Sequence, residues 1–419
     1  MGNDVSVTKK SPRIVLFLAQ PGGALVGKDK PFKDILELCK WAHNECGFEG
    51  VSAPACMPFI DIDSVLNSAE YPDVIRSDYA CAGTPLVRLE MHTVGQRMLL
   101  HPASLPRYKM FTSDLGQEAT FREYETAAET EALMIVNASA KLGFKHLVDF
   151  SGNRGWTAAK YPWSAYPAEW RLKILLLLLA KHRKVLARCA ELGIVRGFEL
   201  HPEEDLNSPL LLFLLRELAK EAAPETVAAI GALADASHPT LAGDCADLHF
   251  KFLHEQRLLR MCHLKDGELG QNFLDADSPE WKGGSIRGDF APKWSRSGRR
   301  FCTFGTGNAD WSKIIPILLQ VHEEQEEGLD FVVEAECSRF PDMRQGIMIA
   351  AENARRAIAG KPLLEAQGFE PEVPIGGNWE DFCTSPVPAE ELLQMNAVEI
   401  GQVAGMREKI PDKLVERFF

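Results

Sequence analysis

The stretch LGIVRGFELHPEED, residues 192–205, joins the end of a helix to a strand that runs into charged residues. Gly193 follows a long amphipathic stretch, at the position where glycine commonly ends a helix. The run after it, VRGFELH, is short, largely apolar and bounded by charged and proline residues, which is typical of a buried strand. The segment therefore predicts one helix-to-strand unit whose strand ends in Glu199 and His201.

The same alternation of short apolar runs and longer amphipathic stretches recurs along the chain. Eight runs are predicted as strands: residues 13–20, 48–54, 85–93, 144–151, 195–201, 239–249, 260–266 and 330–337. Alternating strands and helices imply a parallel sheet, and eight such units favour a closed α/β barrel, the (β/α)8 or TIM barrel. We expect residues 1–360 to form this barrel. Residues 361–419 are expected to form a C-terminal extension that packs on the barrel or at a subunit interface.

The composition argues against several classes of protein. The chain of 419 residues has a formal net charge of -13, and nucleic acids and anionic membranes both prefer basic surfaces. Ten cysteines occur without a CxxC pair, which favours reduced thiols over a disulfide framework or a zinc ribbon. The most apolar run, residues 174–180, is too short to span a bilayer, and the first residues lack an apolar signal core. We therefore expect a cytoplasmic protein that binds neither nucleic acid nor membrane.

Charged and imidazole side chains follow four successive predicted strands. They are Glu199 and His201 on the fifth, Asp244, Asp247 and His249 on the sixth, His263, Lys265 and Asp266 on the seventh, and Glu334 and Glu336 on the eighth. One such residue alone is commonly a helix cap, a solvated loop residue or a hydrogen-bonded core histidine. In a barrel, however, these ends converge, and a shared divalent ion would compensate the burial of the whole set. Oxygen and imidazole ligands suit Mn²⁺, Mg²⁺ or Co²⁺, with Zn²⁺ and Fe²⁺ as alternatives.

Three other segments carry expectations of their own. Residues 203–205, two glutamates and an aspartate, are predicted to be solvated loop and helix-capping residues. Residues 266–308 show no clean periodicity, and a connection of that length is usually a lid or a binding loop. Four aromatic residues at 156–166, Trp163 among them, either stack on a substrate or pack against the barrel rim.

Several of these segments together resemble the xylose isomerase-like barrel superfamily, and most closely its sugar phosphate isomerase/epimerase branch. The matching segments are HTVGQ (92–96), DFSGNRGWTAAKYPWSAYPAEW (149–170), GFELHPEED (197–205), LAGDCADLHF (241–250), RMCHLKDGE (260–268), FCTFGTGNADW (301–311) and FVVEAECSRF (331–340). The resemblance covers about residues 13–358 and implies the barrel fold. The branch hosts several reactions, so the resemblance leaves the substrate open.

The resemblance implies a specific set of site residues. The metal ligands would be Glu199, Asp244, His263 and Glu334, holding one divalent ion, with Mn²⁺ as the first expectation. Glu199 and Glu334 would also exchange the proton, and the substrate would contact His201, His249, Lys265 and Trp163. The chain departs from the branch in one place. The branch usually has Asp-Pro-Ser-His after the sixth strand, whereas DCAD (244–247) places Asp247 where histidine is expected.

These residues favour an enzyme that isomerises or epimerises a keto sugar or keto-glycoside. The proton would leave a carbon next to a polarised carbonyl, giving an enediolate. The same intermediate could instead expel a group from the β carbon, so a 3-keto-glycoside lyase, in some relatives aided by a second subunit, is the alternative. A non-catalytic barrel subunit and a metal-dependent endonuclease fit less well. As partners we expect a small sugar substrate and either further copies of the chain or a small second subunit.

Overall fold

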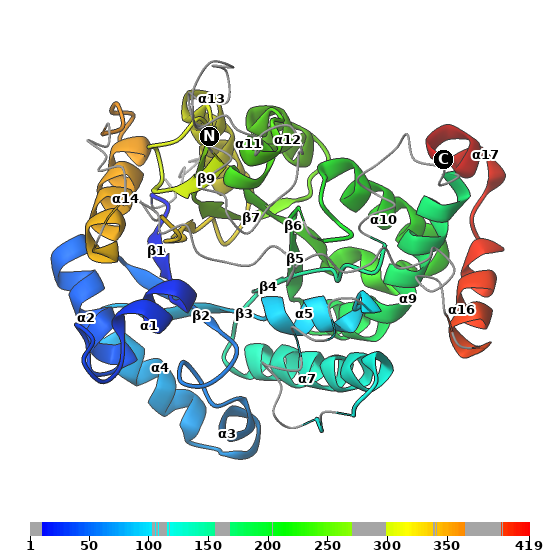
Figure 1. Ribbon diagram of the computed structural model, residues 1–419, viewed down its shortest axis with the longest axis horizontal. Helices are drawn as coiled ribbons and strands as arrows, with labels where there is room; N and C mark the ends of the chain where they lie inside the picture. The colour runs from blue at the N-terminus through cyan, green and yellow to red at the C-terminus, as the bar shows by residue number, and fades with distance from the viewer. Residues whose placement is uncertain are drawn as a thin grey trace, which may run out of the picture. The chain divides into compact units, whose positions relative to one another are not determined.

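The computed structural model contains a closed barrel of eight strands, in the order β1-β10-β7-β6-β5-β4-β3-β2 (Figure 1). It describes residues 11–102, 118–155, 168–202, 204–269, 299–337, 342–364 and 397–419, together with residues 105, 108, 115, 116, 340 and 395. The pairings of β1 with β2 and β10, of β10 with β7, of β4 with β3 and β5, and of β5 with β6 are all parallel. The prediction of a (β/α)8 barrel is therefore confirmed.

The barrel strands are short, and helices separate them along the chain. The strands are β1 (Ile14–Phe17), β2 (Gly50–Pro54), β3 (Leu86–Glu90), β4 (His146–Asp149), β5 (Val195–Glu199), β6 (Ile230–Asp235), β7 (Leu259–Leu264) and β10 (Phe331–Val333). A separate antiparallel pair consists of β8 (Asp266–Leu269) and β9 (Arg299–Cys302). Seven of the eight predicted strands overlap these barrel strands.

The sixth predicted strand is wrong. Residues 239–249 lie in α11 (Ser237–Ala242), a turn and α12 (Ala246–Glu255), and the left-handed Gly243 ends α11. In the true sixth strand, IGALAD, half of the residues are alanine or glycine, which have low strand propensity. All six of its residues are buried, so its place in the barrel outweighs that propensity.

The remaining helices include those on the predicted amphipathic stretches, together with shorter ones near the start of the chain that were not predicted. They are α1 (Ala19–Leu25), α2 (Ile35–Cys46), α3 (Ile62–Asn67), α4 (Tyr71–Cys81), α5 (His92–Met98), α7 (Phe121–Lys141), α9 (Ala168–Glu191), α10 (Pro209–Ala222), α13 (Trp311–Glu324), α14 (Met343–Ile358), α16 (Ala397–Arg407) and α17 (Asp412–Phe418), with a 3₁₀ turn at Pro224–Ala229. Local signals fix their ends. Thr120 and Glu123 form a reciprocal capping box at the start of α7. Gly47, with φ 71°, ends α2 in the left-handed conformation that glycine adopts without strain.

The chain divides into two compact units, and the division runs through β2, β3 and β6. The first unit comprises Met1–Ser52, Arg76–Val87 and Ala234–Glu372. Within it β1 pairs with β2 and β10, and β10 pairs with β7. Asp266, at the start of β8, accepts hydrogen bonds from the backbone N–H groups of residues 267, 307 and 309 and from Trp311 Nε1. These bonds hold both ends of the predicted long loop together, while residues 270–298 lie outside the described residues.

The second unit comprises Ala53–Ile75, Arg88–Leu233 and Val373–Phe419. Here β4 pairs with β3 and β5, and α7 packs on α9. The C-terminal helix α16 lies against α9, as Figure 1 shows. Lys181 of α9 forms ion pairs with Glu399 of α16 and with Glu125 of α7, and Glu125 also pairs with the buried Arg154. The described part of the C-terminal extension is thus attached to α9 by an ion pair between the partly buried Lys181 and the buried Glu399.

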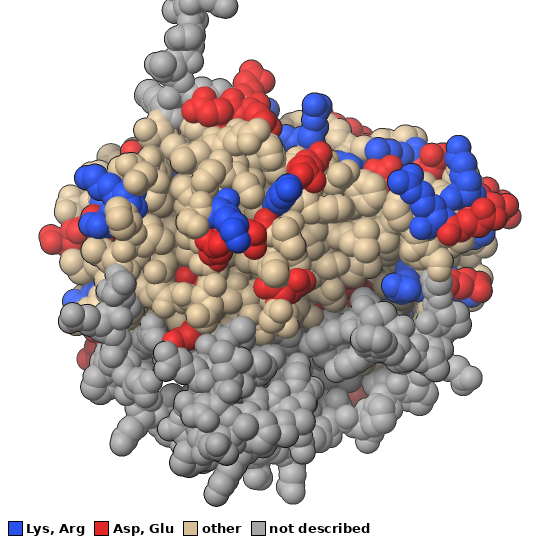
Figure 2. Space-filling model, turned by 90° about the horizontal axis from the view of Figure 1, so that it is seen from above, with Lys and Arg blue, Asp and Glu red and all other residues tan. Residues whose placement is uncertain are grey.

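Three features expected from the composition concern membrane-spanning helices, surface charge and the state of the cysteines. No helix among the described residues is long and apolar enough to cross a membrane. On the face seen in Figure 2, the described basic and acidic side chains are interspersed. All nine described cysteines are free thiols. These observations agree with the predicted reduced state of the cysteines, and the predicted lack of a nucleic-acid partner stays a prediction.

Gly95 in α5 provides a test of how closely this helix packs on the end of β4. A Cβ atom at Gly95 would lie 1.8 Å from Asp149 Oδ1 and 2.2 Å from the backbone oxygen of Phe150. We expect Gly95→Ala to lower the free energy of unfolding by about 2 kcal/mol or more, because overpacked cores cost about 1–3 kcal/mol and here a backbone atom must move. Chemical denaturation measures the change.

The matched control is Gly401→Ala in α16, where a Cβ atom meets nothing within 4 Å. Alanine has a helix propensity about 1 kcal/mol better than glycine, so this variant should be as stable as the wild type or more stable. Equal stability of both variants would contradict the packing of α5 described here.

Candidate metal centre

Asp235, His263 and Glu334 stand at the ends of three barrel strands of the first unit. Asp235 is the last residue of β6, His263 precedes the last residue of β7, and Glu334 directly follows β10. His263 is opposite Val332 in the parallel register, so Glu334, two residues further on, points to the same side. His263 Nδ1 lies 3.1 Å from Glu334 Oε2, and the imidazole stacks on Phe17 of β1 with 5.5 Å between ring centroids.

Lys265, just after β7, is the cation at the centre of this half of the site. Its Nζ lies 3.1 Å from Asp235 Oδ2 and 2.8 Å from Glu334 Oε2. It also donates a 2.9 Å hydrogen bond to Glu336 Oε2. Gln20 of α1 donates to the other oxygens of the two glutamates, at 2.7 Å for Glu334 Oε1 and 3.0 Å for Glu336 Oε1. The amide and the ammonium together orient the Glu334 carboxylate.

Glu199 ends β5 in the second unit and is only 2% exposed. His92, the first residue of α5, places its Nε2 2.8 Å from Glu199 Oε2 and 3.7 Å from Glu90 Oε2. The His92 ring packs on Phe150, which follows β4, with 4.5 Å between centroids. Phe150 in turn lies 5.1 Å from the ring of His201. The Glu199 carboxylate thus faces His92, and the rings of Phe150 and His201 follow beyond His92.

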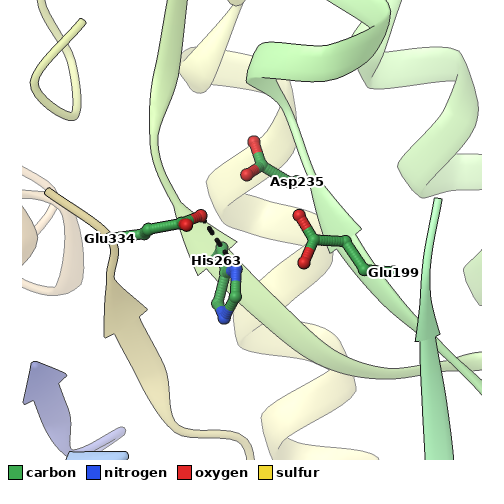
Figure 3. Close-up of side chains that lie close together, drawn as sticks. All are labelled: Glu199, Asp235, His263 and Glu334. Atoms are coloured by element: carbon green, nitrogen blue, oxygen red, sulfur yellow. Dashed lines mark ion pairs between the residues drawn. The ribbon is translucent and has the colours of Figure 1, made fainter. Parts of the chain in front are cut away.

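Glu199, Asp235, His263 and Glu334 form a cluster that could hold a metal ion. Each offers one ligand atom, and these four atoms all lie within 4.8 Å of one another. All four residues are buried. Figure 3 shows the three carboxyl groups and the imidazole pointing toward a common space, with the contact between His263 and Glu334 dashed. They come from β5, β6, β7 and β10, which are consecutive in the barrel.

The donor set fits a divalent cation. Three carboxylates and one imidazole supply the hard oxygen and borderline nitrogen ligands that Mn²⁺, Mg²⁺ or Co²⁺ accept, and no thiolate takes part. Among the described residues Asp235 Oδ2 is buried and accepts no hydrogen bond of normal geometry, although the Lys265 ammonium lies 3.1 Å away. Such a carboxylate oxygen is costly to bury unless a cation binds it.

Asp244, predicted as the third ligand, lies outside this cluster. Its side chain is 60% exposed, and its Oδ2 is 2.8 Å from His249 Nε2. The hydrogen bond from His249 contributes to the lowered pKa of Asp244, against the raising effect of desolvation. Asp247 lies in the first turn of α12, 3.5 Å from Lys313 Nζ. The segment 244–249 therefore forms a helix start, because the strand expected there lies nine residues earlier in the chain.

Asp235 and His238 have the spacing of aspartate and histidine that residues 244–247 lack. The sequence DASH (235–238) has histidine three positions after aspartate, as in the branch that the chain resembles. His238 is buried, with its Nε2 3.6 Å from Asp235 Oδ2 and its ring edge-on to Phe301. The motif was readable in the sequence, but the alanine-rich strand before it concealed its context.

The residues predicted to bind substrate lie in different surroundings. His201 is half-buried beside Phe150, and Lys265 is buried against the carboxylates. His249 pairs with Asp244, which is not part of the cluster, and its predicted contact with substrate stays a prediction. Trp163 lies outside the described residues.

The prediction that residues 203–205 are solvated is wrong for Glu204 and Asp205. Glu204 is buried and accepts hydrogen bonds from Gln96 Nε2 and from the backbone N–H of Gly152, both at 2.7 Å. Asp205 is also buried, and desolvation raises its pKa to about 8, while the backbone N–H of Gly155 donates to it at 2.8 Å. Residue 203 lies outside the described residues. Both carboxyl groups hold the segment after β4.

No family model and no curated protein matches the sequence. Among solved structures, a xylose isomerase domain protein from Planctomyces limnophilus matches with a TM-score of 0.50 and 15% identity, over 84% of this chain and 100% of that one. A probable 3-DHS dehydratase from Bacillus anthracis has a TM-score of 0.48 and 12% identity, over 82% and 98% of the two chains. A D-psicose 3-epimerase from Clostridium cellulolyticum has a TM-score of 0.47 and 10% identity, over 84% and 100%. At these identities the likeness is one of fold.

Two matched variants test whether Asp235, and not Asp244, binds the metal ion. We expect Asp235→Ala to weaken Mn²⁺ binding by at least about 100-fold, since losing even an outer-shell partner of a ligand typically costs 10–100-fold. Asp244→Ala should leave the affinity unchanged because its carboxylate pairs with His249. Isothermal titration calorimetry gives both affinities. The reverse ranking, with both variants folded by circular dichroism, would contradict the assignment.

Proposed function

For a chain with the xylose isomerase-like barrel fold, we propose a divalent-metal-dependent enzyme that isomerises or epimerises a keto sugar or keto-glycoside. The observation that carries the proposal is the buried cluster of Glu199, Asp235, His263 and Glu334. These residues end four consecutive barrel strands, which is the face where barrels of this kind carry active sites. Side chains from separate strands come together there. Burying carboxylates in such a group costs free energy unless a cation binds them.

The proposed chemistry divides between the ion and the protein. A bound divalent ion would polarise a sugar carbonyl and lower the barrier to removing the neighbouring proton. Glu199 and Glu334 are the proposed proton-transferring groups. Each is buried and belongs to the cluster, so its carboxylate would lie next to a substrate held at the ion.

Three further side chains are proposed to hold the substrate. Lys265 carries a positive charge next to Asp235 and Glu334 and can donate to sugar oxygens. His201 packs beside Phe150, and His238 stands beside Asp235. Imidazole donors and an ammonium suit hydroxyl and carbonyl oxygens, which supports a polar, oxygen-rich substrate. Mn²⁺ is the proposed ion because the oxygen-rich ligand set is hard with one borderline nitrogen.

The direct test is proton exchange on candidate sugars. The Mn²⁺-loaded protein is incubated in D₂O with 3-keto sugars and with 3-keto-glycosides, and NMR follows the α carbons. Deuterium entering without release of the aglycone is the expected result. Release of the aglycone would favour the β-eliminating lyase, and no exchange with any keto sugar would reject both activities.

Two variants test whether Glu199 and Glu334 carry out the proton exchange. Glu199→Gln and Glu334→Gln should each slow deuterium incorporation by about 100-fold or more, because positioned general acids and bases contribute about 10²–10⁴-fold. Asp244→Asn is the matched control and should exchange at the wild-type rate, since its side chain is largely exposed and outside the cluster.

A further inference from the structure

We propose that Gln20 determines substrate specificity: its side-chain Oε1 accepts a hydrogen bond from a hydroxyl group of the sugar. The inference rests on the proposed function and deepens it, because it requires a free hydroxyl on the substrate beside Glu334. The sequence gave Gln20 no role, and it appeared there only as the end of the first predicted strand, residues 13–20.

Gln20 lies at the same end of the barrel as the metal cluster. It is the second residue of α1, which begins two residues after the end of β1. Strand β1 pairs with β10, and both Glu334 and Glu336 come just after β10. All of these residues belong to the first unit. Gln20 is therefore a side chain of the carboxyl end of the barrel, where active sites of this fold are found.

The two glutamates fix the orientation of the Gln20 amide. Its Nε2 donates at 2.7 Å to Glu334 Oε1 and at 3.0 Å to Glu336 Oε1. An amide nitrogen has two hydrogens and a carboxylate only accepts, so these two bonds use both donors of the amide. Turning the amide over would place its oxygen against two carboxylate oxygens, which repel it. The nitrogen is thus committed to the glutamates, and the oxygen is left for another partner.

Gln20 Oε1 is a buried acceptor to which no group among the described residues donates a hydrogen bond. Leaving such an oxygen unsatisfied costs free energy, and its usual partners are an ordered water or a group of a bound ligand. The residue as a whole is half-buried. Because side chains commonly shift when a ligand binds, a group as small as a hydroxyl can reach the amide oxygen.

The chemistry around Oε1 selects a hydroxyl group. An amide oxygen only accepts, so its partner must carry a hydrogen, and a carbonyl or ether oxygen of the substrate cannot serve. The negative charges of Glu334 and Glu336 disfavour an anionic group, and the Lys265 ammonium beside them already faces three carboxylates. A neutral sugar hydroxyl meets both conditions. Next to Glu334, it would lie close to the proposed proton transfer.

The test asks whether the effect of Gln20 depends on one hydroxyl of the ligand. The Mn²⁺-loaded wild type and Gln20→Met are titrated by calorimetry with methyl β-D-glucopyranoside and its 2-, 3-, 4- and 6-deoxy derivatives, which have no ketone and are not turned over. We expect the variant to bind the parent and all but one derivative about tenfold more weakly, the net effect of one hydrogen bond. The remaining derivative lacks the hydroxyl that Gln20 accepts, so both proteins should bind it equally.

Equal losses across the whole series would overturn the inference, because a residue that only orients Glu334 weakens the binding of all these ligands alike. Equal affinities of the two proteins, or no binding of any glycoside by the wild type, would overturn it as well. Gln320→Met is the matched control: Gln320 donates to Glu324 on the exposed side of α13, and its loss should change no affinity. Deuterium exchange on keto sugars tests the proposed function separately, so either can fail while the other holds.

A second measurement needs neither metal nor sugar. In the ¹⁵N-glutamine-labelled chain, the side-chain resonances that disappear in Gln20→Met or Gln20→Asn belong to Gln20. We expect both of its Nε2 protons to exchange with water more slowly than those of the exposed Gln320, because both are donated to carboxylates. Exchange as fast as that of Gln320 would contradict the fixed amide and overturn the inference.

Discussion

Burying several carboxylates at one end of a barrel is the constraint on which the rest of the site depends. Within the first unit, one ammonium, that of Lys265, lies within 3.1 Å of oxygens from Asp235, Glu334 and Glu336. One positive charge cannot neutralise three negative ones, and each uncompensated ion in a protein interior costs several kcal/mol. The imbalance is the physical argument for a cation, and the neutral donor Gln20 adds orientation without further charge.

The fold was predictable where apolar pattern and local caps agree. Stretches such as Ile35–Cys46 and Phe121–Lys141 have clear helical periodicity and good caps, and most strands have branched or aromatic residues. The sixth strand was missed because IGALAD has little strand propensity of its own. Because of that single error Asp244 was expected as a ligand, whereas Asp235, at the end of the observed strand, is the aspartate in the cluster.

Other parts of the site could not be read from sequence because they depend on contacts between distant segments. Glu204 and Asp205 follow a histidine and a proline, and their sequence context predicts solvated residues. In the structure both are buried and accept hydrogen bonds from backbone N–H groups after β4. His92 gives no signal beyond a short motif, because its contacts are with Phe150 and Glu199, 58 and 107 residues further along (150 − 92 and 199 − 92). In contrast Glu199, His263 and Glu334 stood out, because each interrupts an apolar strand with a group that is rarely buried alone.

The central claim is that the four strand-end residues bind one divalent ion. The most direct measurement is an anomalous difference map from crystals of the full chain soaked in Mn²⁺, with data collected near the manganese absorption edge. The account predicts one strong peak within about 2.0–2.6 Å of oxygens from Glu199, Asp235 and Glu334 and of a His263 nitrogen. A strong peak at Asp244 and His249, or an ordered cluster with no peak at saturating Mn²⁺, would contradict it.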